Sequence, residues 1–239
     1  LVDRRCEAAA QEIARQLGLD HTFIFEDQDK GWKISQFVPD CRAPEVGDGQ
    51  QLAQMMQLAR KLHDSGLEVD ATFDFYAESC RYEELLGGRD AIDIPGYQAI
   101  ARKFDRLHGY VAAEPTTICL SHNDFWPMNI LLDAQGAMHL IDWEYAGMAD
   151  YASDFGTFIV ETQADEATAL RALELYFGRT PTAEEVRHNF AFVAFAGWCW
   201  YVWSLYKEFR GEMMGEWLHI YYRYGKDYLE KALRLYEGA

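Results

Sequence analysis

The sequence of 239 residues has little positive charge, no paired cysteines and no long apolar run. Its 22 Lys and Arg residues stand against 39 Asp and Glu residues, which gives a formal net charge of -17. Because a phosphate backbone requires clustered basic side chains, this balance argues against a nucleic-acid partner. It agrees better with a small cationic substrate, although overall acidity is mostly a matter of solubility.

The cysteines are five in number, scattered, and without a C-x-x-C pair. This pattern predicts a reducing, cytoplasmic compartment with neither disulfides nor a zinc site. The most apolar window, residues 190–205, is short and is interrupted by Gly197 and Ser204, so we expect no membrane insertion. No signal peptide opens the chain. The sequence therefore indicates a globular protein of unknown oligomeric state.

What the sequence does contain is a polar series within residues 121–142, SHNDFWPMNILLDAQGAMHLID. The order H-x-D-x-x-x-x-N fits a catalytic loop for phosphoryl transfer, in which the aspartate, Asp124, faces the attacking hydroxyl and the asparagine, Asn129, holds a metal ion. A lone H-x-D could instead be a capped turn with a half-buried His122. The complete series favours the kinase interpretation.

Two short apolar runs, 130–132 and 138–141, are separated by a turn that contains glycine. They predict a β-hairpin, which would carry Asp142 back beside Asn129. Two oxygen ligands arriving together suit Mg²⁺, which completes its coordination with phosphate oxygens and water.

The segments HNDFWPMNILL and IDWEYAG together resemble the choline/ethanolamine kinase family, within the aminoglycoside phosphotransferase-like group of eukaryotic-type kinases. Glu144 and Tyr145, two and three residues after Asp142, indicate the choline kinase branch. The resemblance implies an α+β, protein-kinase-like fold of two lobes, the N-terminal lobe truncated and the C-terminal lobe mostly helical. It makes Asp124 the catalytic base and makes Asn129 and Asp142 the magnesium ligands, with ATP as donor. The histidine of the motif would support the loop.

The family's Gly-rich phosphate loop and its lysine-bearing strand precede the point at which this chain begins, Leu1, so we expect an N-terminal part to be missing. Apolar spacing over residues 3–17 predicts an amphipathic helix that ends at Gly18. By resemblance, Glu7 on this helix would pair with the missing lysine. The alternative is an exposed carboxylate that suits the helix dipole.

Strands are expected around 22–26 and 32–38, with a polar turn between them. The segment ISQFVPD resembles the family's hinge, so Gln36, Phe37 and Val38 would meet the adenine edge of ATP.

A lobe boundary follows the hinge, where Pro, Gly and Asp cluster. Residues 1–38 would then be the remnant of the nucleotide-binding lobe, and residues 39–239 the helical lobe with the catalytic loop and the substrate pocket. Helices are expected at 50–63, 73–86, 96–110, and over most of the chain from 182 onward.

After the second motif the sequence continues as EYAGMADYASDFGTFIVE. Asp154 is expected to cap a helix or to tie down the catalytic loop, since Asp142 already fills the metal position. Glu161 lies two helical turns further on, and the resemblance places it near the bound amine. A solvated helix charge is the alternative.

The C-terminal region is unusually aromatic, and Trp200 and Trp203 are three residues apart and so share a helix face. They resemble the family's tandem tryptophans that form a wall of the choline pocket, whereas Trp198 points elsewhere and is expected in the core. A quaternary ammonium donates no hydrogen bonds, so ring faces must recognise it, at roughly 2 kcal/mol for a desolvated cation over a ring. The predicted substrate-binding residues are Tyr145, Glu161, Trp200, Trp203 and Tyr221, with Tyr222 as an alternative to Tyr221.

The sequence thus predicts ATP- and Mg²⁺-dependent transfer of a phosphoryl group to the hydroxyl of choline, giving phosphocholine. Ethanolamine, an aminoglycoside or another amino alcohol are alternative acceptors. A catalytically dead protein that keeps the fold and binds choline is a further alternative. A purely structural helical module would leave Asp124, Asn129 and Asp142 unexplained.

Overall fold

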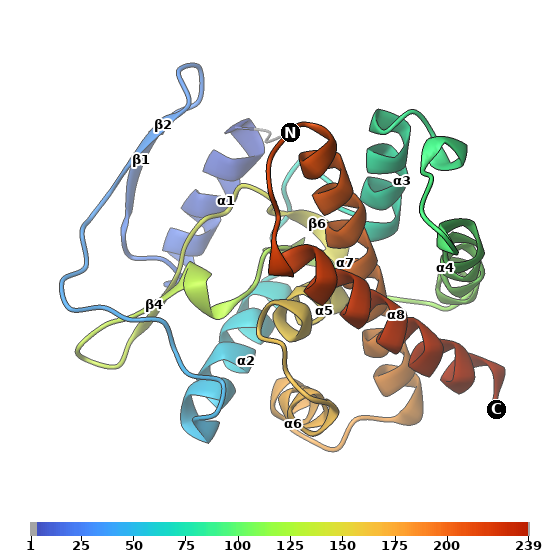
Figure 1. Cartoon of the computed structure of the whole chain (residues 1–239). Helices are drawn as coiled ribbons and strands as arrows, with labels where there is room; N and C mark the ends of the chain where they lie inside the picture. Colours follow the sequence, from blue (N-terminus) through green and yellow to red (C-terminus); the bar gives the residue numbers. More distant parts are fainter. Residues whose placement is uncertain (1–3, 239) are drawn as a thin grey trace. The chain divides into compact units, whose positions relative to one another are not determined.

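A computed structural model describes residues 4–238, and Figure 1 follows the chain through it. The chain forms two compact units. The first contains residues up to 73, 117–154 and 164–181; the second contains 74–116, 155–163 and the chain from 182 onward. The predicted lobe boundary after residue 38 stays a prediction, and the predicted helix start at residue 3 lies outside the described residues.

The first unit opens with helix α1 (Arg4–Gln16), which confirms the predicted amphipathic helix. Strands β1 (Phe23–Asp27) and β2 (Trp32–Ser35) follow and pair antiparallel. The second strand is shorter than predicted: the Gln36 N–H still donates to the Thr22 carbonyl at 2.7 Å, but residues 36–38 on the approach to Pro39 are no longer part of the strand. Proline cannot donate to a ladder, and it restricts the residue before it.

Helix α2 (Gly49–His63), predicted at 50–63, buries an apolar face that contains Met55 and Met56 in the first unit. Asp48 caps it by accepting from the backbone N–H groups of Gln50 and Gln51, as an N-terminal aspartate should. Helix α6 (Glu166–Phe177), which the sequence analysis did not predict, packs against α2.

Four short strands complete the first unit. Strands β4 (Ile130–Leu132) and β5 (Met138–Leu140) form the predicted hairpin. Strands β3 (Ile118–Ser121) and β6 (Gly147–Asp150) form a second antiparallel pair that was not predicted. Residues 122–129 link β3 to β4, and the last three of them form the 3₁₀ turn Pro127–Asn129.

The second unit is built from helices, in agreement with the helices predicted there. These are α3 (Phe75–Leu85), α4 (Tyr97–Ala112), α7 (Ala183–Phe209) and α8 (Glu216–Glu237), with a 3₁₀ turn at Arg89–Ala91. Helix α5 (Ala152–Glu161) begins in the first unit and continues into the second.

Helices α7 and α8 cross in Figure 1 and touch closely at two glycines. A Cβ on Gly197 would lie 2.4 Å from the backbone nitrogen of Gly225, so no other residue fits there without moving a helix. Among the described helices, none combines the length and apolarity that a membrane crossing requires.

Candidate active site

The predicted catalytic loop, residues 122–129, lies between β3 and β4, and it brings Asp124 and Asn129 into contact. The side-chain amide of Asn129 donates to the Asp124 carboxylate oxygen Oδ2 at 2.8 Å and to the Asp124 carbonyl oxygen at 2.9 Å. The amide oxygen of Asn129, the atom that could ligate a metal, takes no part in these two bonds.

Asp142 follows the hairpin, as predicted, and lies beside the loop. The backbone N–H of Ile141 donates to the carbonyl oxygen of Asn129 at 2.9 Å, which ties the hairpin exit to the loop. Asp142 has a left-handed backbone with φ of 66°, a conformation that non-glycine residues seldom adopt. The wholly buried Trp143 anchors this turn through a 2.9 Å bond from Nε1 to the Leu140 carbonyl. The structure thus brings together the three residues predicted for catalysis and metal binding.

Asp154, at the start of α5, holds the predicted catalytic loop by accepting hydrogen bonds from its backbone. It accepts the backbone N–H of Asn123 at 2.6 Å and that of His122 at 3.1 Å. The ring nitrogen Nε2 of His63 lies 2.9 Å from the same carboxylate. His122 is itself fully buried and its Nε2 lies 2.9 Å from the Ile141 carbonyl, a contact suited to a supporting residue.

Nearby carboxylates influence the pKa values of Asp124 and Glu144. Burial raises the pKa of Asp124, and the nearby carboxylates of Asp142 and Asp154 add to the rise, while His122 and the Asn129 hydrogen bond oppose it. Burial also raises the pKa of Glu144, with Asp142 and Asp124 contributing. Asp154 differs: burial opposes its ionisation, but the hydrogen bond from His63 and the charges of both histidines bring its pKa below the ordinary value.

The donor set fits a hard divalent cation. Asp142 offers a carboxylate and Asn129 an amide oxygen, which are the ligand types that Mg²⁺ takes before phosphate and water complete its shell. Among the described residues, no group of three or more His, Cys, Asp and Glu side chains is arranged to hold a metal by itself. A site built from this pair would therefore need ligands from a bound phosphate.

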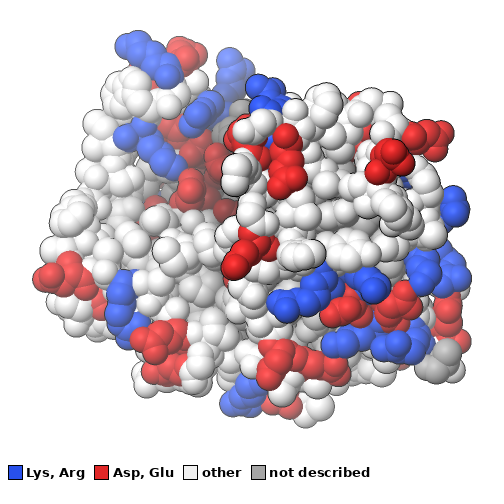
Figure 2. All heavy atoms as spheres, viewed as in Figure 1, with Lys and Arg blue, Asp and Glu red and all other residues white. Residues whose placement is uncertain are grey.

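Glu7 is buried on α1, and its partner in this chain is Lys33 of β2. The Lys33 Nζ lies 3.0 Å from Oε1 of Glu7, and Arg4 reaches Oε2 at 3.2 Å. The sequence analysis assigned Glu7 to an upstream lysine and did not consider Lys33. The alternative of an exposed Glu7 is wrong, since its side chain is 1 % exposed. In Figure 2, acidic and basic side chains gather over α1 and the β1–β2 hairpin.

The three predicted hinge residues line one cavity in the first unit. Gln36, Phe37 and Val38 border a space of about 300 Å³, together with the β4–β5 turn, residues 133–135. His139 lies on the same wall, where Asp133 contacts its ring nitrogen at 3.2 Å. The cavity is large enough for a purine base, and its role as an adenine site remains a prediction.

The predicted aromatic pair lies in the second unit on α7. The rings of Trp200 and Trp203 meet edge to face, with centroids 5.7 Å apart and planes at 80°. Phe75 packs against Trp200 at 5.8 Å. The ammonium of Lys207 lies 5.6 Å from the Trp203 ring centroid, so this indole already accepts a cation.

Two further predicted substrate residues are paired in the second unit: the Tyr221 hydroxyl donates to Oε1 of Glu161 at 3.0 Å. Tyr145 belongs to the first unit, where its ring lies 6.3 Å from that of Phe73 and its carbonyl accepts from Asn123 at 2.9 Å. That all five predicted residues form one pocket stays a prediction.

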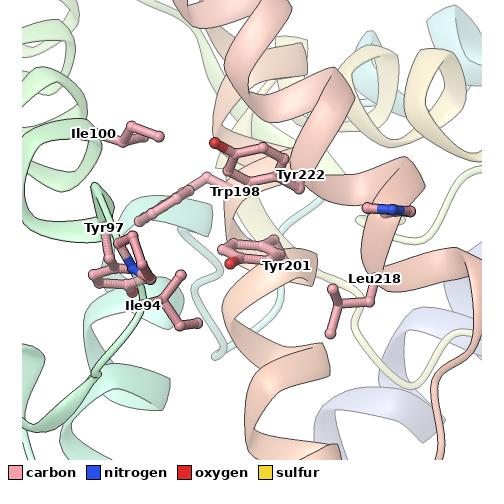
Figure 3. Close-up of a pocket in the computed structure, with 9 residues that line it drawn as sticks. Ile94, Tyr97, Ile100, Trp198, Tyr201, Leu218 and Tyr222 are labelled. Atoms are coloured by element: carbon pink, nitrogen blue, oxygen red, sulfur yellow. The ribbon is translucent and has the colours of Figure 1, made fainter.

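A separate apolar pocket of about 210 Å³, drawn in Figure 3, lies on another face of α7. Trp198 and Tyr201 line it together with Tyr222 of α8 and Tyr97 of α4. The prediction that Trp198 is a core residue is confirmed, because it is 2 % exposed and stacks on Phe104. The sequence analysis missed this pocket, although Trp198 and Tyr201 are also three residues apart.

Comparisons with known proteins identify the family and the fold of the chain. A family model described as choline/ethanolamine kinase matches residues 5–190, more than half of the chain. The chain is 26 % identical over 255 residues to the LicA protein of Haemophilus influenzae, covering 99 % of this chain and 89 % of that protein. A choline/ethanolamine kinase family protein from Mesorhizobium loti superposes with a TM-score of 0.80 at 22 % identity, covering 98 % of this chain and 79 % of the other. A LicA protein in complex with AMP superposes with a TM-score of 0.79 at 22 % identity, covering 100 % and 80 %. The predicted α+β, kinase-like fold is thus confirmed.

Proposed function

Since the chain belongs to the choline/ethanolamine kinase family and is a kinase that acts on an alcohol group, we propose that it transfers the γ-phosphoryl group of ATP to the hydroxyl of choline. The observation that carries this proposal is the convergence of Asp124, Asn129 and Asp142 through the 2.8 Å and 2.9 Å contacts of the loop and hairpin. Nucleotide use is supported by the cavity at Gln36, Phe37 and Val38.

Asp124 orients the acceptor hydroxyl and takes its proton as the hydroxyl oxygen attacks phosphorus. A raised pKa suits this task, because a stronger base accepts the proton more readily. Asn129 holds Asp124 in place through its side-chain amide. Most of the rate then comes from positioning and from fixed charges, since the protein forms no covalent intermediate in such a transfer.

Asn129 and Asp142 are the residues that would hold Mg²⁺. When bound, the ion neutralises charge on the phosphate oxygens during transfer. Asp154 keeps the loop in position through the backbone N–H groups of His122 and Asn123.

Choline is favoured as acceptor by the ring chemistry of the second unit. Trp200, which is buried, and Trp203, which is partly exposed, meet at 80°. Indole faces suit a cation that cannot donate hydrogen bonds. Ethanolamine is the second candidate, and Glu161 favours it, because a primary ammonium donates hydrogen bonds that a carboxylate accepts. The carboxylate of Glu161 supports both acceptors, so the rings must discriminate between them.

The first experiment is a coupled ATP-consumption assay with choline, ethanolamine and an aminoglycoside at fixed Mg²⁺. Asp124→Asn keeps the shape and removes the base, so kcat should fall on the order of 10²- to 10⁴-fold. Asp48→Asn is the matched control, since Asn caps α2 as well as Asp does. Near-normal turnover by Asp124→Asn would reject the assignment. Binding of choline without turnover by the unmodified protein would favour a protein that binds but does not catalyse.

The second experiment asks which acceptor the rings select. Trp203→Ala should raise the KM for choline more than the KM for ethanolamine, by roughly 10-fold or more for a cation over a ring. Phe209→Ala, which removes an exposed ring near the end of the same helix, is the control. Equal losses for both acceptors would count against a cation-binding role of the indoles.

A further inference from the structure

A lysine ammonium lies among the acidic side chains of the first unit. Lys33 Nζ is 3.0 Å from Oε1 of Glu7 and 3.5 Å from Oδ1 of Asp142, and thus joins helix α1 to the residue that follows the β4–β5 hairpin. All three residues belong to the same compact unit. The contact therefore connects a buried carboxylate to the carboxylate assigned above to metal binding.

The two contacts of Lys33 differ in how firmly they are held. The Glu7 side chain is 1 % exposed, so loss of Lys33 would leave this buried charge with Arg4 alone to compensate it. The Asp142 side chain is 50 % exposed, and exposed ion pairs of this kind contribute little. Lys33 can therefore give up Asp142 at small cost while it keeps Glu7.

A nucleotide bound beside Asp142 would bring several negative charges to a region that already contains the carboxylates of Asp124, Asp142 and Glu144. A cationic side chain at this site would offset part of that negative charge. An ammonium on a flexible stem has three donors, and it can serve Glu7 and a phosphate oxygen at the same time.

We propose that Lys33 is a phosphate-contacting residue, which holds Asp142 in the free protein and donates to a phosphate oxygen of a bound nucleotide while it remains paired with Glu7. This inference rests on the proposed function only in that a nucleotide binds beside Asp142. It requires no particular acceptor.

The test is calorimetric binding of ADP and of adenosine, each with and without Mg²⁺ and without any acceptor. Lys33→Met keeps the length of the side chain and removes the charge, and should weaken ADP about 10- to 100-fold, as expected for a charge-assisted bond to phosphate. Adenosine has no phosphate, so its affinity should stay within about twofold in this variant. Lys33→Arg should retain part of the ADP affinity.

Lys30→Met is the matched control, because Lys30 lies in the same hairpin and its side chain is 72 % exposed. It should leave both ligands unaffected. An ADP affinity of Lys33→Met within twofold of the unmodified protein would overturn the inference. An equal loss for ADP and adenosine would also overturn it, because a merely structural role predicts that result. So would a failure of the unmodified protein to bind ADP.

Kinetics separate this inference from the proposed function. Lys33→Met should raise the KM for ATP at least 10-fold while the KM for choline stays within about twofold. If the unmodified protein does not phosphorylate choline but its ADP affinity depends on Lys33, the acceptor is wrong and the inference stands. If it phosphorylates choline and Lys33→Met keeps its ADP affinity, the function stands and the inference fails.

Discussion

Replacing Asp154 by alanine tests whether the catalytic loop depends on one buried carboxylate. The side chain accepts the backbone N–H groups of His122 and Asn123 at 3.1 and 2.6 Å, and it lies 2.9 Å from the ring of His63. Hydrogen bonds to a charged acceptor contribute about 1.5–3 kcal/mol each, but they are not additive. Breaking a buried charged network costs about 3–5 kcal/mol, so the melting temperature of a chain of this size should fall by roughly 10 °C.

The same change should reduce kcat, because displacement of a catalytic group by about 1 Å can cost on the order of 10²-fold. Differential scanning calorimetry and the coupled assay measure the two effects. Asp165→Ala is the matched control: it removes a helix cap that accepts only at the surface from Thr168, at 2.8 Å, and should cost about 1 kcal/mol with kcat unchanged. A melting temperature of Asp154→Ala equal to that of the control, or an unchanged kcat, would refute the reasoning.

The pH dependence of this effect follows from the lowered pKa of Asp154. A carboxyl whose pKa is lower in the folded state stabilises the protein above its unfolded pKa, near 3.9, and loses that contribution as pH falls through the folded pKa. The difference in stability between the unmodified protein and Asp154→Ala should therefore be constant at neutral pH and should shrink only below about pH 4.

Two further predictions concern other parts of the chain. Gly197→Ala should lower the free energy of unfolding, measured in urea, by about 1–3 kcal/mol, since its Cβ would lie 2.4 Å from a backbone nitrogen of α8. Gly109→Ala is the control: a Cβ on this helical glycine would meet nothing within 4 Å, so the substitution should be neutral or stabilising. Because Asp124 must be ionised to act as a base and its pKa is raised, kcat/KM should begin to fall at a pH above the ordinary aspartate range near 3.9. A profile that is flat down to pH 4 would contradict that role.

Patterns of neighbouring residues in the sequence predicted many of the helices and strands of this fold. The β4–β5 hairpin was predictable because both strands and the turn lie within eleven residues, Ile130–Leu140. The β3–β6 pair was not, since Ile118 and Asp150 meet across a long separation and neither strand shows alternation of its own. Helix α6 did carry a local signal, an aspartate cap before an apolar periodic run, and could have been found.

Lys33 illustrates what local patterns leave open. A lysine in a short strand is usually a solvated side chain, and nothing in its neighbourhood along the sequence indicates a buried partner. Its contact with Glu7 depends on which face of the β1–β2 hairpin lies against α1, which is a tertiary outcome. By contrast, Asp124 and Asn129 were predictable as a pair because only four residues of loop separate them.

Helix α7 shows why spacing alone cannot identify a substrate pocket. The three-residue spacing that places Trp200 and Trp203 on one helix face also places Trp198 and Tyr201 on one face. The rings of Trp198 and Tyr201 lie 5.5 Å apart, and both line the pocket of Figure 3. The two pairs differ in the charge expected beside them. The predicted set around Trp200 and Trp203 includes Glu161, whereas none of the residues that line the Figure 3 pocket is acidic, and a desolvated quaternary ammonium needs negative charge as well as ring faces. Tyr222→Ala, which opens the Figure 3 pocket, should therefore leave the KM for choline within about twofold, whereas Trp203→Ala raises it. The reverse order would assign choline to the Figure 3 pocket.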